Sequence, residues 1–136
     1  MIGVVLVSHG ALGRALLDTA TEIVGRIEPA VAVSVGRQQS LEDIEADLRE
    51  AVEQVDRGQG VLFLVDMFGG TASNVALGMV ERGKIEVVTG FNLPMLLKLS
   101  STLRSATDLL ALAQLVRAYG QKHVLIASEV LGEKGS

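Results

Sequence analysis

Two side chains that can do chemistry, His9 and Asp66, each come at the end of a run of apolar residues. His9 follows IGVVLVS at residues 2–8, and Asp66 follows GVLFLV at residues 60–65. An aspartate that bonds one nitrogen of an imidazole fixes the tautomer and leaves the other nitrogen free as a base or a nucleophile. The two residues therefore predict acid–base or nucleophilic chemistry if the fold brings them together.

Apolar runs alternate with helical patterns along the chain. The strand-like runs cover residues 2–8, 30–35, 60–66, 85–90 and 123–129. The helical patterns cover residues 12–24, 41–55, 71–80 and 106–119, with a further helix start at Pro94. Strands that alternate with helices are typical of a doubly wound α/β fold with a largely parallel sheet. We therefore expect a three-layer sandwich with strand order 2-1-3-4, one domain over residues 1–131 and a tail over residues 132–136.

Capping-box patterns predict where two of the helices begin. Ser40 is followed by Asp43, and Ser105 is followed by Asp108. In such a pair the serine side chain caps the helix and the carboxylate three residues on bonds back to the serine amide. We therefore expect helices to start directly after Ser40 and Ser105.

The ends of the strands are where a ligand is expected. In an open α/β sheet, ligands bind outside the carboxyl ends of the strands, at the point where the strand order reverses. In the order 2-1-3-4 the first and third strands are neighbours, so His9 and Asp66 would face each other there. Gly10 would allow the tight turn into the next helix. Arg37 and Asn92 follow the second and fourth strands and would lie on the same rim.

Two helices are expected to begin at this edge, one after Gly10 and one after Gly70. Helix N-termini present unpaired N–H groups and the positive end of the helix dipole, which favour anions such as phosphate. The sequence Gly69-Gly70-Thr71 adds a glycine turn and a hydroxyl group. A lone histidine, aspartate or glycine pair in a loop is usually structural, but their combination favours a histidine that meets a phosphoryl group.

The composition excludes several classes of function. The 136 residues carry a net charge of −4 and 3% aromatic residues, so neither charge nor stacking favours nucleic acid as a partner. The chain has no cysteine and only two distant histidines, so we expect no metal and no cofactor. P-loop, dinucleotide-binding and G-x-S-x-G motifs are absent. No apolar run approaches the roughly 20 residues of a membrane span, and we expect a cytoplasmic protein.

Three segments resemble the IIA component of the mannose family of the sugar phosphotransferase system. They are VLVSHG around His9, GVLFLVDMFGGTASN around Asp66, and GFNLPML at residues 90–96. The resemblance covers essentially the whole chain. It implies a phosphotransferase in which the phosphocarrier protein HPr phosphorylates His9 on Nε2 while Asp66 holds Nδ1. The phosphoryl group would then pass to a IIB component in sugar uptake or its regulation.

The resemblance also bears on the surroundings of His9. It implies that Thr71 contacts a phosphoryl oxygen. The family often has tryptophan at the position of Phe68, and Ser-Pro or Thr-Pro where Thr71 and Ala72 stand, so the hydroxyl is kept while the neighbouring surface differs. From the strand ends and the resemblance together, we expect the substrate- and partner-binding residues to be Gly10, Arg37, Phe68, Gly69, Gly70 and Asn92.

The partners expected from the resemblance are HPr and a IIB protein. No IIB domain follows the matched region, so we expect IIB to be a separate chain, and any association with the membrane to run through a permease complex. The sugar is not predicted, because a IIA component never touches it. Two alternatives stay open: a phosphocarrier subunit of a dihydroxyacetone kinase system, which also has a V-S-H strand end, and a dimeric regulatory protein whose His9 is never phosphorylated.

The last apolar run, HVLIASE at residues 123–129, predicts an edge strand. An exposed edge strand of this kind invites pairing with another chain, and strand exchange is a low-cost route to a two-fold dimer. The resemblance implies such a dimer as well. We therefore expect a homodimer in which this strand lies antiparallel in the partner's sheet, and we assign His123, which begins the run, a structural role.

Overall fold

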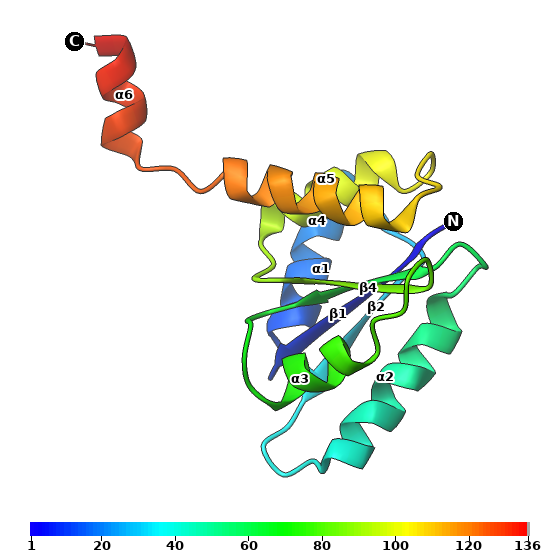
Figure 1. Cartoon of the computed structure of the whole chain (residues 1–136). Coiled ribbons are helices and arrows are strands. Elements are labelled where there is room, and N and C mark those ends of the chain that lie inside the picture. Colours follow the sequence, from blue (N-terminus) through cyan, green and yellow to red (C-terminus); the bar gives the residue numbers. More distant parts are fainter. Residues whose placement is uncertain (136) are drawn as a thin grey trace.

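Four parallel strands form the sheet at the centre of the molecule (Figure 1). The structure, a computed structural model, describes residues 1–135. The strands are β1 (Gly3–His9), β2 (Ala30–Val35), β3 (Val61–Val65) and β4 (Ile85–Thr89). Their order is β2-β1-β3-β4, and every pair is parallel. The expected order is confirmed, and β1 lies between β2 and β3.

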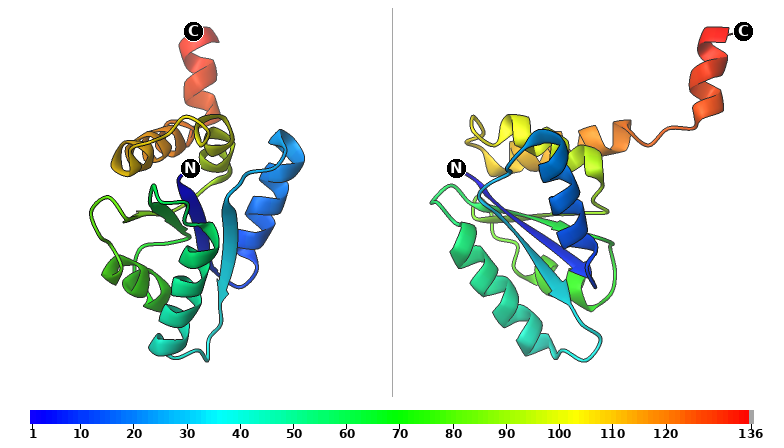
Figure 2. Two further views of the ribbon diagram at one scale, coloured as in Figure 1. Left: turned by 90° about the vertical axis from the view of Figure 1, so that its right-hand side faces the viewer. Right: turned by 180° about the vertical axis from the view of Figure 1, so that it is seen from behind.

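Helices cover both faces of the sheet, which confirms the three-layer sandwich (Figures 1 and 2). On one face lie α1 (Leu12–Val24), α4 (Leu93–Thr102) and α5 (Leu109–Lys122). On the other face lie α2 (Leu41–Val55) and α3 (Thr71–Gly78). Crossovers through helices are what parallel strands require, because each strand must return to the same end of the sheet before the next begins.

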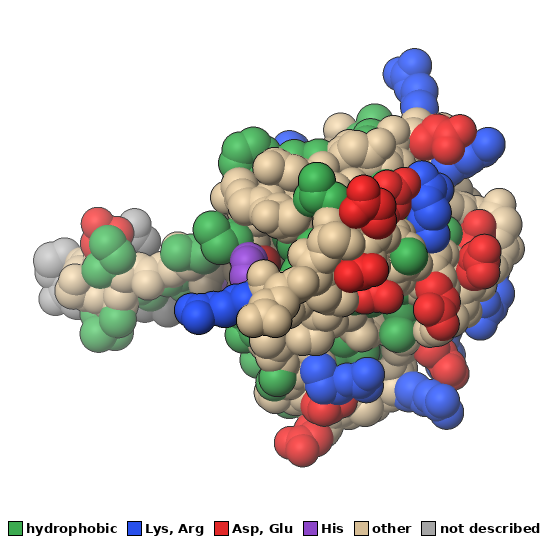
Figure 3. Space-filling model, turned by 90° about the horizontal axis from the view of Figure 1, so that it is seen from below, with side chains coloured by type: hydrophobic (Ala, Val, Ile, Leu, Met, Phe, Trp, Pro, Cys, Tyr) green, Lys and Arg blue, Asp and Glu red, His purple; other side chains and the backbone are tan. Residues whose placement is uncertain are grey.

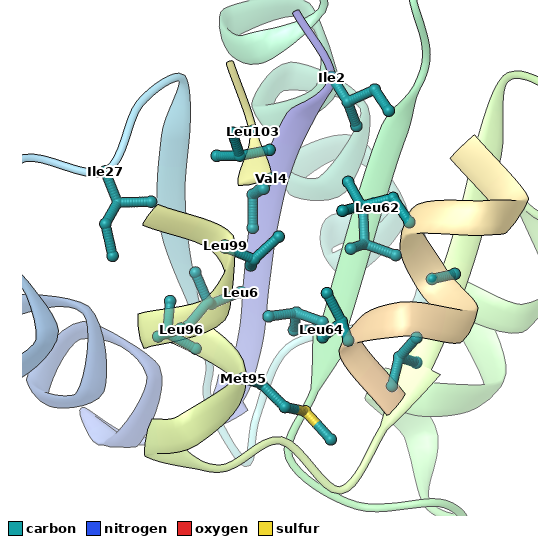
Figure 4. Close-up of a cluster of buried hydrophobic side chains, with 14 of the residues drawn as sticks. Ile2, Val4, Leu6, Ile27, Leu62, Leu64, Met95, Leu96, Leu99 and Leu103 are labelled. Carbon is teal, nitrogen blue, oxygen red and sulfur yellow. The ribbon is translucent and has the colours of Figure 1, made fainter. Parts of the chain in front are cut away.

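The sheet has a hydrophobic core on each face because successive side chains of a strand point in opposite directions. Along β1, Val4 and Leu6 join the core under α1, α4 and α5, whereas Val5 and Val7 join the core under α2 and α3. Figure 4 shows the first of these cores, with Leu96 and Leu99 of α4 beside Leu6 of β1 and with Leu62 of β3 on the side of α5. All six residues of β1 that precede His9 are buried, so the strand is fixed on both faces.

The start of α2 follows the sequence pattern, but the start of α5 does not. The Ser40 hydroxyl accepts a hydrogen bond from the Asp43 amide at 3.1 Å, and the Asp43 carboxylate accepts one from the Ser40 amide at 3.3 Å. At α5 the capping residue is Asp108, which accepts from the Ala111 amide at 3.0 Å. The prediction for Ser105 was wrong because this residue belongs to the turn that ends α4, where its amide bonds the Thr102 carbonyl.

The C-terminal segment differs most from the prediction. Residues 124–126 have no regular secondary structure and pair with no strand of the described chain, and α6 (Ala127–Gly135) follows them. The strand predicted over residues 123–129 is therefore wrong for the single chain. A strand needs a neighbour for its N–H and C=O groups, whereas a helix satisfies them within the segment. Figure 2 shows α6 standing away from the rest of the molecule.

Residues near the C-terminus expose a series of apolar side chains. Val124, Leu125 and Ile126 are 75%, 66% and 61% exposed. The tail expected from residue 132 overlaps α6, which continues to Gly135, and Ser136 lies outside the described residues. Among residues 1–135, no helix combines the length and the apolar character needed to cross a membrane.

Candidate functional site

His9 and Asp66 meet at the carboxyl end of the sheet, as the sequence predicts. Oδ2 of Asp66 lies 2.9 Å from Nδ1 of His9 and accepts a hydrogen bond from the His9 amide, also at 2.9 Å. The His9 side chain is 58% exposed and that of Asp66 is 9% exposed. The arrangement therefore joins a nearly buried carboxylate to an accessible imidazole.

The sheet register explains how residues 57 positions apart come together. β1 pairs with β3 so that Val7 lies opposite Val65, and the Asp66 amide bonds the Val7 carbonyl at 3.1 Å. Asp66 is thus the first residue beyond β3, while β1 runs on to His9. Because the strands are parallel, both residues arrive at the same edge of the sheet.

The environment of Asp66 keeps its carboxyl ionised at neutral pH. Burial alone would raise the pKa of this group, but the hydrogen bonds from the amide and ring of His9 outweigh burial and hold the pKa below its ordinary value of 3.8. An ionised carboxylate only accepts hydrogen bonds, so the proton of a neutral His9 ring belongs on Nδ1. Nε2 then keeps its lone pair, and it makes no hydrogen bond with any residue that the structure describes.

A cavity of about 600 Å³ opens beside His9. It lies between the loop after β1, the loop after β2 and the start of α3. Its lining residues are His9, Gly10, Ser34, Val35, Gly36, Arg37, Gln39, Ile44, Thr71 and Ala72. The structure therefore brings Gly10, Arg37 and Thr71 to the same cavity as His9, although they come from three separate segments of the sequence.

The glycine turn before α3 leads into a helix start whose backbone amides are available as hydrogen-bond donors at this cavity. Gly69 and Gly70 have φ angles of +89° and +88°, which glycine adopts without the strain that a side chain brings. The Gly69 amide donates to the buried Ser73 hydroxyl at 2.9 Å, which holds the turn against the helix. Within residues 1–135 the amides of residues 71–73 make no hydrogen bond, so the positive end of the α3 dipole is free for an anion.

Phe68 and Asn92 lie at this edge in different roles. Phe68 is 72% exposed beside Asp66 and the glycine turn. Asn92 does not line the cavity. Its side chain caps α4 by accepting from the Met95 amide at 3.1 Å and donates to the Gly120 carbonyl at 3.0 Å. The structure thus gives Asn92 the task of joining the start of α4 to the end of α5.

Sequence reasoning missed three polar residues that shape the cavity. The buried Ser8 hydroxyl accepts from the Gly13 amide at 2.7 Å, and the Ser34 hydroxyl donates to the Gly10 carbonyl at 2.5 Å. Gln39 accepts from the Gly36 amide at 2.8 Å and donates to Asp47 at 2.9 Å. The available signal was the placement of Ser8 and Ser34 as polar residues at the ends of otherwise apolar strands.

The two histidines differ in their surroundings. His123 lies at the C-terminus of α5, where Nδ1 is 2.8 Å from the Tyr119 carbonyl and the ring lies against that of Tyr119, tilted by 37° with 4.1 Å between centroids. No carboxylate pairs with it among the described residues. Nor does the described part of the chain hold a group of three or more side chains that could bind a metal ion.

Comparisons with known proteins agree with this geometry. A family model described as "PTS system fructose IIA component" matches residues 3–116. The chain is 31% identical over 132 residues to the "PTS system fructose-specific EIIA component" of Bacillus subtilis, covering 96% of this chain and 90% of the relative. It is 32% identical over 98 residues to the "PTS system mannose-specific EIIAB component" of Escherichia coli K12, covering 71% of this chain and 30% of that longer protein.

A solved structure matches the fold as well. The "Mannose/sorbose specific IIA subunit of phosphotransferase system from Enterococcus faecalis" superposes with a TM-score of 0.79 at 28% identity, covering 92% of this chain and 93% of the other. With the histidine, the aspartate and the glycine turn in place, the chain belongs to the mannose family of IIA components of the sugar phosphotransferase system.

Proposed function

We propose that the protein is a phosphocarrier that accepts a phosphoryl group from phospho-HPr on Nε2 of His9 and passes it to a IIB component. The observation that carries the proposal is the contact between Nδ1 of His9 and the carboxylate of Asp66. In the neutral ring this contact puts the proton on Nδ1 and leaves the Nε2 lone pair free beside the cavity. The proposal needs no nucleotide, because phospho-HPr supplies the phosphoryl group.

The transfer is a displacement between two imidazoles. The Nε2 lone pair of His9 forms the new N–P bond, and the N–P bond of the donor breaks with its electron pair returning to the donor ring. His9 keeps its Nδ1 proton, so the phosphorylated ring carries a positive charge. Asp66 faces this charge at 2.9 Å and stabilises it. Transfer to IIB follows the same steps in reverse. The N–P bond on His9 must therefore not be so stable that the phosphoryl group cannot leave.

Thr71 and the start of α3 are suited to receive the phosphoryl oxygens. Thr71 lines the cavity, and its hydroxyl makes no hydrogen bond with the described residues. The hydroxyl and the free amides of Thr71 and Ala72 can donate to the oxygens of the transferred group. These donors are held in place before the group arrives, so little reorganisation is needed during transfer.

Exposed apolar side chains around His9 favour a protein as the partner. Leu12, Met67 and Phe68 are 53%, 51% and 72% exposed, and they come from the two segments that carry His9 and Asp66. Apolar side chains grouped around a reactive residue are typical of protein–protein contact. Arg37 also lines the cavity and adds a positive charge that would attract a phosphoryl group.

The dimer with an exchanged C-terminal segment remains part of the proposal. Among the described residues, the outer edge of β4 has no strand partner beyond a single bridge at Ile85. Residues 124–126 are apolar, exposed and outside any helix or strand, so a second copy could supply the pairing that each lacks.

The surface beside the C-terminal extension also differs from the rest. Seen from below, charged side chains gather over one half of the molecule, while hydrophobic and uncharged ones prevail beside the C-terminal extension (Figure 3).

The decisive experiment is phosphorylation of the purified chain by phosphoenolpyruvate, enzyme I and HPr. We expect one phosphate per chain, labile to acid and stable to base. His9→Ala should abolish labelling without unfolding the protein, because the side chain is largely exposed. His123→Ala is the matched control and should be labelled normally. Label that persists in His9→Ala, or that mass spectrometry finds on Thr71 or Asp66, would overturn the assignment.

A further inference from the structure

The backbone around His9 is held by side chains of both neighbouring strands. On the β3 side, Asp66 accepts a hydrogen bond from the His9 amide at 2.9 Å. On the β2 side, the Ser34 hydroxyl donates to the Gly10 carbonyl at 2.5 Å. The peptide units on the two sides of this short segment are therefore fixed by one carboxylate and one hydroxyl.

The sheet register places Ser34 for this contact. β2 pairs with β1 so that Ser34 lies opposite Ser8, two residues before Gly10. Beyond His9 the chain leaves the strand and turns into α1 through Gly10, whose φ angle is +53°. Ser34 therefore reaches the first carbonyl after the strand that carries His9.

Nothing packs on the side of Gly10 where a Cβ would lie, which leaves hydrogen bonds to restrain this peptide. No atom outside the neighbouring residues lies within 4 Å of the position that a Cβ on Gly10 would occupy. Glycine also has the widest range of backbone conformations. The Ser8 hydroxyl, which accepts from the Gly13 amide, also donates to the Gly10 carbonyl, but at 3.4 Å this second bond is at the long end of the hydrogen-bonding range. Ser34 is thus the principal restraint on the Gly10 peptide.

The Ser34 hydroxyl donates its hydrogen bond to the Gly10 carbonyl, so its role is to hold the backbone and not to bind phosphate. Ser34 and Gly10 both line the cavity beside His9. The Ser34 hydroxyl has a single proton, and that proton is directed to the Gly10 carbonyl, so it is not available to a phosphoryl oxygen. The bond also occupies a carbonyl oxygen that would otherwise repel an anion in the cavity.

We propose that Ser34 is a positioning residue: its hydrogen bond to the Gly10 carbonyl fixes the turn after β1 so that the His9 ring stays on Asp66 with its proton on Nδ1. The expected effect on the rate of phosphorylation rests on the proposed phosphocarrier function, whereas the expected effect on the tautomer of the His9 ring does not. Loss of the hydroxyl should let the turn sample other conformations, and the His9 ring should then spend less time against Asp66.

Nitrogen NMR of histidine-labelled protein tests the effect on the ring directly. The chain has two histidines, and His123→Ala assigns their signals. We expect Ser34→Ala to lower the fraction of His9 in the Nδ1–H tautomer and Ser34→Thr, which keeps the hydroxyl, to restore it. Ser101→Ala is the matched control, because Ser101 is also exposed and donates to a backbone carbonyl, that of Lys98 at 2.9 Å. A tautomer ratio in Ser34→Ala equal to that of the wild type would overturn the proposal.

Kinetics of phosphorylation by phospho-HPr give the second readout. Ser34→Ala should lower kcat by about two- to tenfold, the scale of one net hydrogen bond, and leave the KM for phospho-HPr unchanged. Ser34→Thr should recover the rate. A raised KM with unchanged kcat would instead make Ser34 a partner contact and overturn a positioning role. If the wild type takes no label at all, the phosphocarrier function fails, while the tautomer measurement still decides the role of Ser34.

Discussion

Oδ2 of Asp66 accepts two hydrogen bonds from a single residue, His9: one from its backbone amide and one from Nδ1, each at 2.9 Å. The same oxygen therefore sets where the end of β1 lies and which ring nitrogen carries the proton. Backbone position and ring orientation are therefore coupled, and in the proposed phosphocarrier this would present the His9 ring in the same way to the donor and to the acceptor.

Asp66→Asn should slow phosphoryl transfer by about 10- to 100-fold, the scale expected for loss of one or two hydrogen bonds to a charged group. Asparagine keeps the shape, but its NH₂ group can face Nδ1 and favour the wrong tautomer. The comparable change in a serine-protease triad costs on the order of 10⁴ in kcat, and we expect less here because the attacking nitrogen belongs to the histidine itself. Rapid-quench measurement with phospho-HPr checks this. Asp18→Asn, on the exposed face of α1, is the control, and rates equal to wild type in Asp66→Asn would remove Asp66 from the mechanism.

The stability contributed by Asp66 should depend on pH in the acid range. Its pKa in the folded protein lies below the ordinary 3.8, so the folded state binds the proton less readily than the unfolded chain does. The contribution is therefore fully present above pH 3.8 and is lost as pH falls through the folded pKa. Denaturant unfolding from pH 6 to pH 2 should show the free-energy gap between wild type and Asp66→Asn shrinking below about pH 4. A gap that stays constant across this range would show that ionisation of Asp66 is not what stabilises the fold.

Arg37→Ala should slow phosphorylation by HPr, and the effect should be larger at low salt than at high salt. Arg37 is exposed on the wall of the cavity beside His9, and salt screens interactions of exposed charges over about 10 Å at 0.1 M. Initial rates at 20 and 500 mM NaCl would measure the effect. Arg57→Ala removes the same charge beyond the end of α2 and serves as the control. A loss that does not change with ionic strength would exclude electrostatic attraction.

Removal of residues 124–136 should convert a dimer into a monomer or an aggregate. This deletion keeps α5 intact and removes the exposed apolar segment together with α6. Light scattering coupled to size-exclusion chromatography gives the mass. Deletion of residues 132–136 alone leaves residues 124–126 in place and should leave the dimer unchanged. A full-length protein that is monomeric at all concentrations tested would contradict the exchanged dimer.

The sequence predicted the elements that depend on local pattern and the contacts that the sheet imposes. Runs of buried residues located β1 and β3, and the parallel order then required His9 and Asp66 to share an edge. The contacts of Ser34 and Asn92 could not be predicted in this way. In each contact a side chain donates to a backbone carbonyl of another segment, Gly10 or Gly120. Such a contact leaves no periodic pattern in the sequence.

The C-terminal segment shows a second limit. Its apolar residues are compatible with a strand, but a strand forms only where another strand is available to pair with it. In the single chain, the backbone groups of residues 127–135 are satisfied within a helix instead. The choice between the two structures therefore depends on a partner that is not encoded in the local pattern.

The burial of β1 has a consequence for how the protein opens. Six of its seven residues are buried between two neighbouring strands and two layers of helices, and only His9 is exposed. Amide hydrogens in such a strand exchange with solvent only when the whole domain unfolds, whereas loops and chain termini open locally and often. The reactive ring is thus attached one residue beyond the slowest-exchanging segment of the molecule. Local fluctuations of the surrounding loops would therefore leave His9 anchored to the part of the fold that we expect to open last.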